Sequence, residues 1–156
     1  MTRKTTRRTF IRQSAAVTAG VGYWASSSPA AKAQSALESP AAACIGVGGK
    51  GSSDTSHIGE HGVAIVGLCD VDGGTLSKKG REFPDAKQFQ DFREMLDQLG
   101  DKVDIVTVST PDHTHAAAAV RAMRLTKHGY CQKPLAWSIR EARWMRDVAG
   151  ERGGVS

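Results

Sequence analysis

The sequence predicts an open α/β fold, a doubly wound parallel sheet with helices on both faces. From Ala42 onward, short apolar runs alternate with amphipathic segments. The apolar runs are continuous, which suits parallel strands that are buried on both faces. Hydrophobic residues make up 40% of the chain, an ordinary value for a globular domain. Repeated strand–helix units of this length imply right-handed crossovers between neighbouring strands.

Five strands are expected, over residues 42–46, 63–69, 86–89 and 103–109 and around Tyr130-Cys131. The fourth is the strongest prediction, because it is β-branched almost throughout. The fifth is expected to be locally weak. Thr126 stands at a helix end that favours Gly, and Gly129 stands in a strand position that favours a β-branched residue.

Helices are expected between these strands. Two begin with a capping box, Asp91 with Glu94 and Ser138 with Glu141. Another is expected over residues 115–126, which are rich in alanine. A helix should also follow the first strand.

Three cysteines, Cys44, Cys69 and Cys131, fall on predicted strands. Their odd number and the absence of C-x-x-C spacing argue against a disulfide framework or a zinc knuckle. We expect them to behave as small buried apolar groups. Two tryptophans around the last helix, Trp137 and Trp144, are expected to pack against the core.

A glycine-rich loop follows the first strand. Residues 46–51 read Gly-Val-Gly-Gly-Lys-Gly and satisfy G-x-G-x-x-G. The first Gly permits a tight turn, the second lets the backbone approach a pyrophosphate, and the third allows close helix–strand packing. The phosphates would lie at the helix N-terminus, where the dipole favours negative charge. The predicted contacts are Gly46, Gly48, Gly49, Lys50 and Gly51.

An acid ends the second strand, as a Rossmann dinucleotide site requires. Asp70 lies 19 residues beyond Gly51, where a carboxylate accepts hydrogen bonds from the adenosine ribose. It would repel a 2′-phosphate, so NAD is favoured over NADP. Two alternatives remain open at this point. Asp70 could be a solvated turn acid, or the loop and acid could belong to a methyltransferase.

Polar turns follow the fourth and fifth strands. Residues 109–115 read Ser-Thr-Pro-Asp-His-Thr-His, and residues 131–135 read Cys-Gln-Lys-Pro-Leu. Ligands of doubly wound sheets lie outside the carboxyl ends of the strands, so both turns should face the cofactor. With the glycine loop, these motifs resemble the glucose–fructose oxidoreductase/inositol dehydrogenase/MocA-like oxidoreductases. The resemblance runs from about Ala42 to the C-terminus and disfavours a methyltransferase.

The resemblance implies roles for the two turns. Lys133 would contact the nicotinamide ribose and the substrate as the catalytic residue, and the Thr-Pro turn would pack beside the nicotinamide. Gln132 stands where the family usually has Glu. It keeps an acceptor oxygen but carries no charge, and we interpret it as a subgroup trait. The implied cofactor contacts are Ser109, Thr110, Pro111, His115, Gln132, Lys133 and Pro134.

No metal site is expected. His113 and His115 stand two residues apart in a loop, but no third ligand lies nearby in the sequence. His57 and His61 fall four residues apart on the first helix and are expected to be surface residues.

Members of the resembled family carry a second α/β domain, which supplies most of the substrate pocket and an Asp/His catalytic pair. Residues 153–156 read as the start of a sixth strand, so we expect the chain to be the cofactor-binding half of a longer enzyme. Alone it should bind NAD weakly and turn over no substrate. Three functions are open: a dehydrogenase of a sugar or cyclitol hydroxyl, an NAD-dependent glycosidase, and a non-catalytic dinucleotide-binding module. A homo-oligomer is compatible with the full-length form.

The first 33 residues have the composition of an export signal. Arg7-Arg8 precedes Phe10, an uncharged run over residues 13–31 and a small-x-small cleavage pattern, Ala31-Lys32-Ala33. This order resembles a twin-arginine signal, which the export machinery reads as an address. We expect export to the periplasm, with a membrane anchor where the signal stays uncleaved.

The leader also accounts for the net charge of +5. Six of the 21 basic residues lie in the first 33 positions, which contain no Asp or Glu. Residues 34–156 therefore carry 15 basic and 16 acidic residues, a net charge of −1. This removes the main support for a nucleic-acid partner. The expected organisation is a signal at 1–33, a linker at 34–41 and a dinucleotide-binding domain at 42–156.

Overall fold

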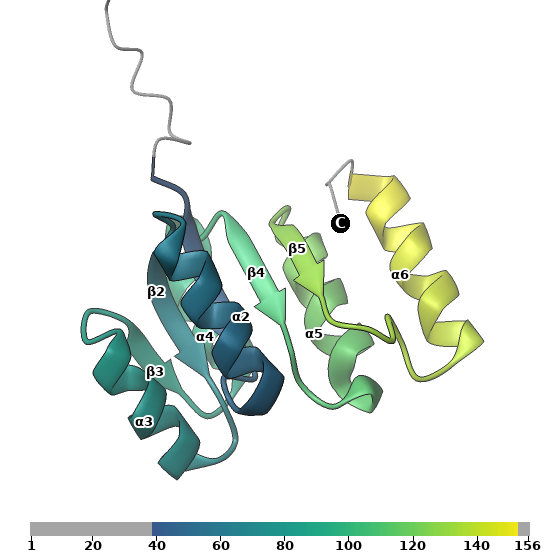
Figure 1. Ribbon diagram of the computed structural model, residues 1–156. Helices are drawn as coiled ribbons and strands as arrows, with labels where there is room; N and C mark the ends of the chain where they lie inside the picture. The colour runs from purple at the N-terminus through teal and green to yellow at the C-terminus, as the bar shows by residue number, and fades with distance from the viewer. Residues whose placement is uncertain (1–38, 153–156) are drawn as a thin grey trace, which may run out of the picture. The chain divides into compact units, whose positions relative to one another are not determined.

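The computed structural model describes residues 39–152. The predicted leader and the predicted start of a sixth strand lie outside these residues. Five parallel strands form one sheet in the order β3-β2-β1-β4-β5, as Figure 1 shows. They are β1 (Ala41–Ile45), β2 (Ala64–Cys69), β3 (Lys87–Phe89), β4 (Ile105–Val108) and β5 (His128–Cys131).

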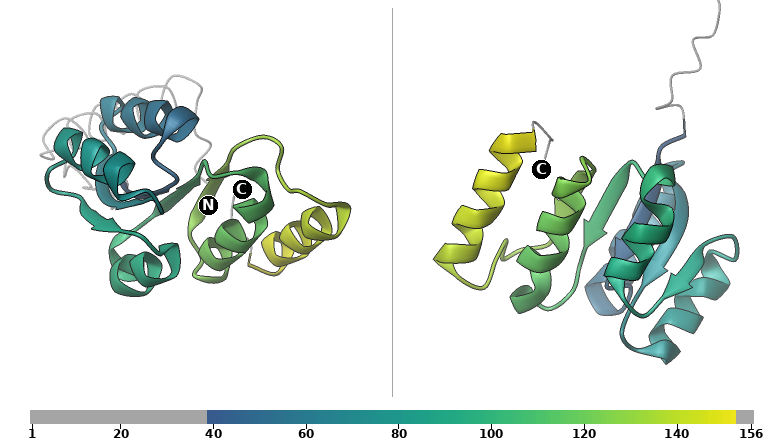
Figure 2. Two further views of the ribbon diagram at one scale, coloured as in Figure 1. Left: turned by 90° about the horizontal axis from the view of Figure 1, so that it is seen from below. Right: turned by 180° about the vertical axis from the view of Figure 1, so that it is seen from behind.

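Helices cover both faces of the sheet. They are α2 (Gly49–Glu60), α3 (Gly73–Glu82), α4 (Phe92–Leu99), α5 (Asp112–Arg124) and α6 (Ile139–Arg152), with a 3₁₀ turn at Gly100–Lys102. Seen along the sheet, α2 and α3 lie on one side and α4, α5 and α6 on the other (Figure 2). The doubly wound parallel sheet predicted from the sequence is thus confirmed. Strand order reverses between β1 and β4, the switch point where such sheets bind ligands.

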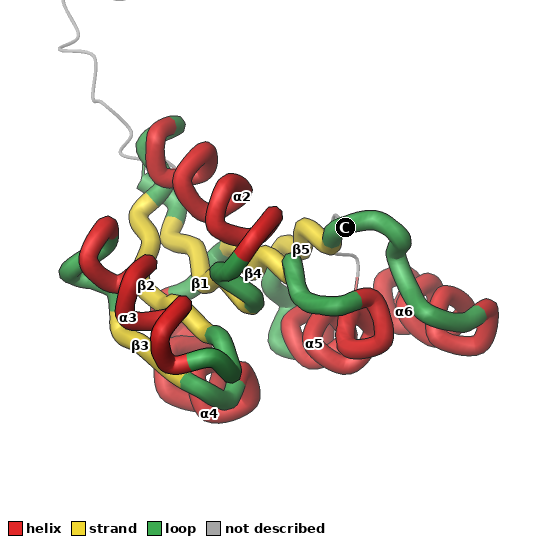
Figure 3. Tube along the Cα trace, turned by 60° about the horizontal axis from the view of Figure 1, so that its bottom comes forward, coloured by secondary structure: helices red, strands yellow, loops and turns green. Residues whose placement is uncertain are grey.

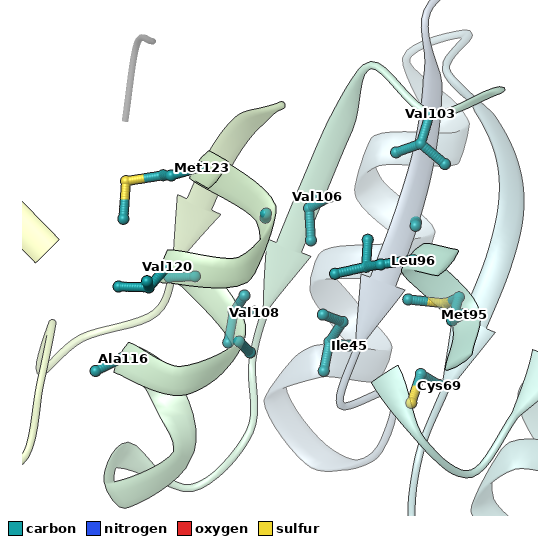
Figure 4. Packing of buried hydrophobic residues seen from close by; sticks show 14 of the residues in the cluster. Ile45, Cys69, Met95, Leu96, Val103, Val106, Val108, Ala116, Val120 and Met123 are labelled. Carbon is teal, nitrogen blue, oxygen red and sulfur yellow. The ribbon is translucent and has the colours of Figure 1, made fainter. Parts of the chain in front are cut away.

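The core has two layers that follow the alternation along β1. Ala43 and Ile45 face the cluster that contains α4 and α5, whereas Ala42 and Cys44 face the cluster that contains Leu76 of α3. Figure 4 shows the first layer, with Ile45, Val106 and Val108 among the labelled side chains of α4 and α5. Since both faces of the central strands are buried, the continuous apolar runs have their physical explanation.

Two helices differ from the sequence expectation. The α3 helix was not singled out, because Gly73-Gly74 suggests a turn. Its signal is Asp72, whose side chain caps the helix by accepting from the Thr75 N–H at 2.6 Å. The α5 helix begins at Asp112 and not at His115, since Pro111 holds its own backbone at φ −59° and precedes the first turn.

The two tryptophans differ as well. Trp137 is 68% exposed and Trp144 is 40% exposed, so the prediction that they pack into the core is wrong. The α6 helix instead buries Met145 and Val148. The guanidinium of Arg124 lies 5.7 Å from the centre of the Trp144 ring, a cation–π contact that leaves the indole at the surface.

The three cysteines are free thiols on strands, as expected. Cys44 and Cys69 are buried, and Cys131 is partly buried. Burial, together with the nearby negative charges of Asp70 and Asp91, raises the pKa of Cys69 to about 12. Burial raises the pKa of Cys131 to about 11.

Thr126 precedes β5 with φ +58°. This is the left-handed conformation that a Gly adopts without cost and a β-branched residue does not.

None of the helices within residues 39–152 combines the length and the hydrophobicity that crossing a bilayer demands.

Candidate functional site

The loops that follow β1, β2, β4 and β5 lie at one edge of the sheet. Figure 3 turns this edge toward the viewer, with the glycine loop before α2 and the turns before α5 and α6 in green. Because all strands are parallel, their carboxyl ends carry every predicted site residue to the same edge.

The glycine loop packs tightly against the end of β1. Gly46 has φ +79°. A Cβ on Gly51 would lie 1.8 Å from the Gly46 carbonyl oxygen, so only glycine permits this approach. The α2 helix starts after Gly48 with no side-chain cap and no acidic residue in its first turn. Its N-terminal N–H groups are therefore suited to an anionic group such as a pyrophosphate.

Asp70 fixes the shape of this loop. Its Oδ2 accepts from the N–H of Val47 at 3.0 Å and of Gly48 at 3.2 Å, and its Oδ1 accepts from the Asp72 N–H at 3.0 Å. A Cβ on Gly48 would come within 3.0 Å of the Thr75 side chain. The acid that sequence spacing assigned to ribose binding thus holds the glycine loop to the end of β2, and its contact with a ribose stays a prediction.

A cavity of about 490 Å³ lies between the glycine loop and the Thr-Pro turn. Predicted site residues line it together with His113 and Thr114 of the turn that was expected to face the cofactor. Sequence reasoning missed other lining residues, among them Val71, Gln90 and Phe92. Gln90 and Phe92 follow β3, which ends at the same edge, so their position after a third strand was an available signal. The cavity, the uncapped helix and Asp70 together fit a dinucleotide.

His115 joins the two polar turns. It is 1% exposed, with Nδ1 at 2.8 Å from the Pro134 carbonyl oxygen and Nε2 at 2.7 Å from the Thr110 carbonyl oxygen. A cofactor contact through His115 stays a prediction; its position shows a link between the Thr110 and Pro134 turns.

A buried carboxylate that the sequence analysis missed bonds to three of the predicted site residues. Asp54 of α2 is 7% exposed. It accepts from Ser109 Oγ at 2.9 Å and from Gln132 Nε2 at 2.8 Å, and it pairs with Lys50 Nζ at 2.6 Å. Its position one helical turn after Lys50 was the only sequence signal.

The predicted catalytic residue lies in the turn after β5. Lys133 is exposed, its backbone N–H lies 3.2 Å from Gln132 Oε1, and its peptide bond to Pro134 is cis. The structure therefore brings the glycine loop, Asp70, the Thr110 turn and the Lys133 turn to one edge. The catalytic role of Lys133 remains a prediction.

The two neighbouring histidines of the Thr-Pro turn have different environments. His113 is exposed, with Nδ1 at 3.9 Å from the Asp112 carboxylate, whereas both ring nitrogens of His115 face carbonyl oxygens. Within residues 39–152, no group of three or more His, Cys, Asp or Glu side chains is arranged to hold a metal ion. His57 and His61 are exposed on and just after α2, as predicted.

Comparison with known proteins identifies relatives of this arrangement. Residues 41–156 match the profile of GFO_IDH_MocA, the oxidoreductase family with an NAD-binding Rossmann fold. A glycosyl hydrolase family 109 protein of Shewanella pealeana is 32% identical over 115 residues, which cover 67% of this chain and 25% of that protein. An inositol 2-dehydrogenase of Rubrobacter xylanophilus is 30% identical over 115 residues, covering 70% of this chain and 31% of that protein.

Among solved structures, the WlbA dehydrogenase of Chromobacterium violaceum, in complex with NADH and UDP-GlcNAcA, superimposes with a TM-score of 0.69 at 20% identity. The match covers 74% of this chain and 33% of that one. At this identity the likeness concerns the fold. The chain spans a quarter to a third of the length of these relatives.

Proposed function

Because the chain belongs to the GFO_IDH_MocA oxidoreductase family, with its NAD-binding Rossmann fold, we propose that it is the cofactor-binding half of an exported, NAD-dependent dehydrogenase. The substrate class is a sugar or cyclitol, oxidised at a hydroxyl-bearing carbon. A second domain, supplied by a longer form of the protein, completes the substrate pocket. That longer form could be a homo-oligomer.

The observation that carries the proposal is the close approach of Gly51 to the Gly46 carbonyl beneath an uncapped helix N-terminus. The N–H groups at the start of α2 are suited to a pyrophosphate, and the spacing of Asp70 from the glycine loop assigns that carboxylate to the adenosine ribose. A carboxylate at this position repels a 2′-phosphate, which favours NAD over NADP.

Lys133 is assigned the proton transfer. Bound NAD supplies the hydride acceptor for oxidation of an alcohol carbon. The hydroxyl proton must leave as well, and an amine at the end of β5 is suited to accept it. Two hydrogen bonds hold the turn that carries this amine. One joins the Lys133 backbone N–H to Gln132 Oε1, and the other joins His115 Nδ1 to the Pro134 carbonyl oxygen.

The binding half of the proposal is tested by titrating the chain with NADH and NADPH and following nicotinamide fluorescence. NADH should bind weakly and NADPH more weakly still. Asp70→Asn should lower NADH affinity about tenfold, the equivalent of one charge-assisted hydrogen bond. Asp72→Asn is the matched control, because Asn keeps the cap on Thr75. Equal affinity of the Asp70 variant and wild type would contradict the assignment.

The catalytic half is tested in a longer form that contains the second domain. Lys133→Ala should abolish turnover while leaving much of the NAD affinity, since the lysine acts on the substrate hydroxyl. An unchanged rate would remove Lys133 from the mechanism. Tight NAD binding with no turnover by the wild-type protein would favour a non-catalytic dinucleotide-binding module.

A second candidate function is an NAD-dependent glycosidase, which oxidises its substrate transiently and releases a sugar by elimination. Similarity to glycosyl hydrolase family 109 proteins favours it. The two activities differ in their cofactor balance. A glycosidase cleaves an aryl glycoside with no net change in NADH absorbance, whereas a dehydrogenase accumulates NADH in proportion to product.

Export through the twin-arginine route rests on Arg7-Arg8 and on the small-x-small pattern that ends at Ala33. The test fuses residues 1–33 to a reporter that must fold before export. Export should require the arginine pair and fail in an Arg7→Lys/Arg8→Lys variant. Arg3→Lys is the control, because it changes a basic residue outside the pair. Export of the double variant at the wild-type rate would contradict the route.

A further inference from the structure

The strongest unassigned feature is the contact set of Asp54. This carboxylate lies on α2, the helix that begins at the glycine loop. It bonds to Ser109 directly after β4 and to Gln132 directly after β5. It is thus a single buried acid that links α2 to the loops after β4 and β5.

We propose that Asp54 is the positioning residue of the Lys133 turn, and that it acts by fixing the side-chain amide of Gln132 and therefore requires a neutral residue at that position. The inference rests on the proposed function of the Lys133 turn. It assigns Asp54 no contact with the cofactor or the substrate.

The orientation of the Gln132 amide follows from its partners. Nε2 donates to Asp54 Oδ2 at 2.8 Å and lies 3.1 Å from the Tyr130 hydroxyl oxygen. The donor end is thereby committed to Asp54, so Oε1 turns toward the main chain and accepts from the Lys133 N–H at 3.2 Å. The acid on α2 thus determines which end of the amide meets the residue that carries the proposed catalytic amine.

The charge balance of the cluster explains why Gln suits position 132. Asp54 has one cationic partner, Lys50, whose side chain is 62% exposed, whereas the Asp54 side chain is 8% exposed. Burial alone would raise the pKa of Asp54. Hydrogen bonds from Lys50, Gln132 and Ser109 outweigh burial and hold the pKa below its ordinary value. A glutamate at 132 would replace one of these donors with a second anion at hydrogen-bond distance, where like charges oppose joint ionisation.

The test is a double-variant cycle in the 156-residue chain. Gln132→Glu should lower NADH affinity about tenfold at pH 8 and the melting temperature by about 5 °C, because two carboxylates meet in a buried site. Asp54→Asn should also weaken binding, since the Asn side chain keeps one acceptor oxygen but loses the negative charge and the second oxygen, which pairs with Lys50. The combination Asp54→Asn/Gln132→Glu restores one carboxylate and one amide with the roles exchanged. It should recover NADH affinity to within about threefold of wild type.

Two measurements separate positioning from general packing. The defect of Gln132→Glu should shrink as pH falls from 8 toward 5, since one of the paired carboxyl groups takes up a proton. Two other titratable groups interact with Asp54, and neither changes its charge in this range. The pKa of Lys50 is raised by its hydrogen bond to Asp54, and the pKa of the Cys44 thiol is raised by burial. The backbone amide signal of Lys133 in a ¹⁵N–¹H spectrum should shift in both single variants and return in the double variant.

Glu82→Gln is the matched control. Glu82 also accepts from a lysine and from a hydroxyl of α2, namely Lys79 and Ser56, but it lies away from the strand ends. It should leave NADH affinity and the Lys133 signal unchanged.

Additive effects in the double variant, or a Gln132→Glu variant that behaves as wild type, would overturn the role of Asp54. The proposed function can fail separately. If the wild-type chain binds no NADH, the cofactor assignment is wrong. The positioning role would still hold if the double variant restores the Lys133 signal and the melting temperature.

Discussion

The two ends of the candidate site are held together in different ways. At the glycine-loop end, Asp70 bonds to backbone N–H groups of the loop, and Gly51 packs on the Gly46 carbonyl. At the Lys133 end, the turn is exposed, and two buried side chains hold it, His115 and Asp54. The glycine-loop end requires positions without a side chain, because its backbone segments are in direct contact. The Lys133 end requires long-range hydrogen bonds from buried side chains.

The difference concerns sequence separation as much as chemistry. Asp70 and Val47 are 23 residues apart within one β1–α2–β2 unit, whereas Asp54 and Gln132 are 78 residues apart. A single strand–helix–strand unit can therefore shape the phosphate end. The Lys133 end forms only after β4, α5 and β5 have docked. Substitutions at the first end should act through backbone overlap, and those at the second through lost hydrogen bonds.

The largest effect is expected for Gly51→Ala. The added methyl group would lie 1.8 Å from the Gly46 carbonyl oxygen, and a clash with backbone costs about 3 kcal/mol or more of unfolding free energy. Urea unfolding followed by circular dichroism measures it. Gly129→Ala is the control, because nothing lies within 4 Å of a Cβ there. Similar losses in both variants would show that overlap at the loop is not the cause.

His115→Ala should cost less, about 2–3 kcal/mol, because it removes a buried ring and its contacts with the Thr110 and Pro134 carbonyls without creating a clash. The neighbouring His113→Ala removes an exposed ring and should stay within about 0.5 kcal/mol of wild type. If His115→Ala destabilised the protein more than Gly51→Ala, the claim that backbone overlap costs more than lost hydrogen bonds would be wrong.

Acid should act on the Lys133 end through Asp54. A carboxyl whose pKa is lowered by folding stabilises the protein above the unfolded-state pKa, near 3.8, and that contribution is lost as pH falls through the lower folded-state pKa. Wild-type stability should therefore decline below about pH 4. The decline should be shallower in Asp54→Asn, as measured by urea unfolding at pH 3 to 6. Parallel curves would contradict the pairing of Asp54 in solution.

A small stabilisation is expected from Thr126→Gly. Thr126 has φ +58° before β5, and a β-branched residue in that conformation costs about 1 kcal/mol relative to glycine. The unfolding midpoint in urea should rise. Thr110→Gly, at a position with no positive φ, gives the reference for added chain flexibility, and a fall in the Thr126→Gly midpoint would refute strain at this turn.

The sequence predicted the fold well, and it predicted which loops meet at the carboxyl edge of the sheet. Parallel strands, the glycine loop and Asp70 follow from local patterns: apolar runs, glycine spacing and an acid after a strand. Asp54 and its bond to Gln132 could not be predicted, because no local pattern links positions so far apart. The cofactor role of His115 came from the family resemblance, and no local pattern in the sequence predicted its contacts with the Thr110 and Pro134 carbonyls. Trp137 and Trp144 were expected to pack against the core because size and hydrophobicity alone do not say which side chains on and before α6 face solvent.

The three cysteines have a consequence for the compartment that we propose. Disulfide exchange proceeds through the thiolate, and thiols with pKa values of about 12 and about 11, as at Cys69 and Cys131, are almost wholly protonated at neutral pH. Cys44 is fully buried, and burial raises its pKa too. A domain with these thiols could cross into an oxidising environment and remain reduced without a partner for any of them.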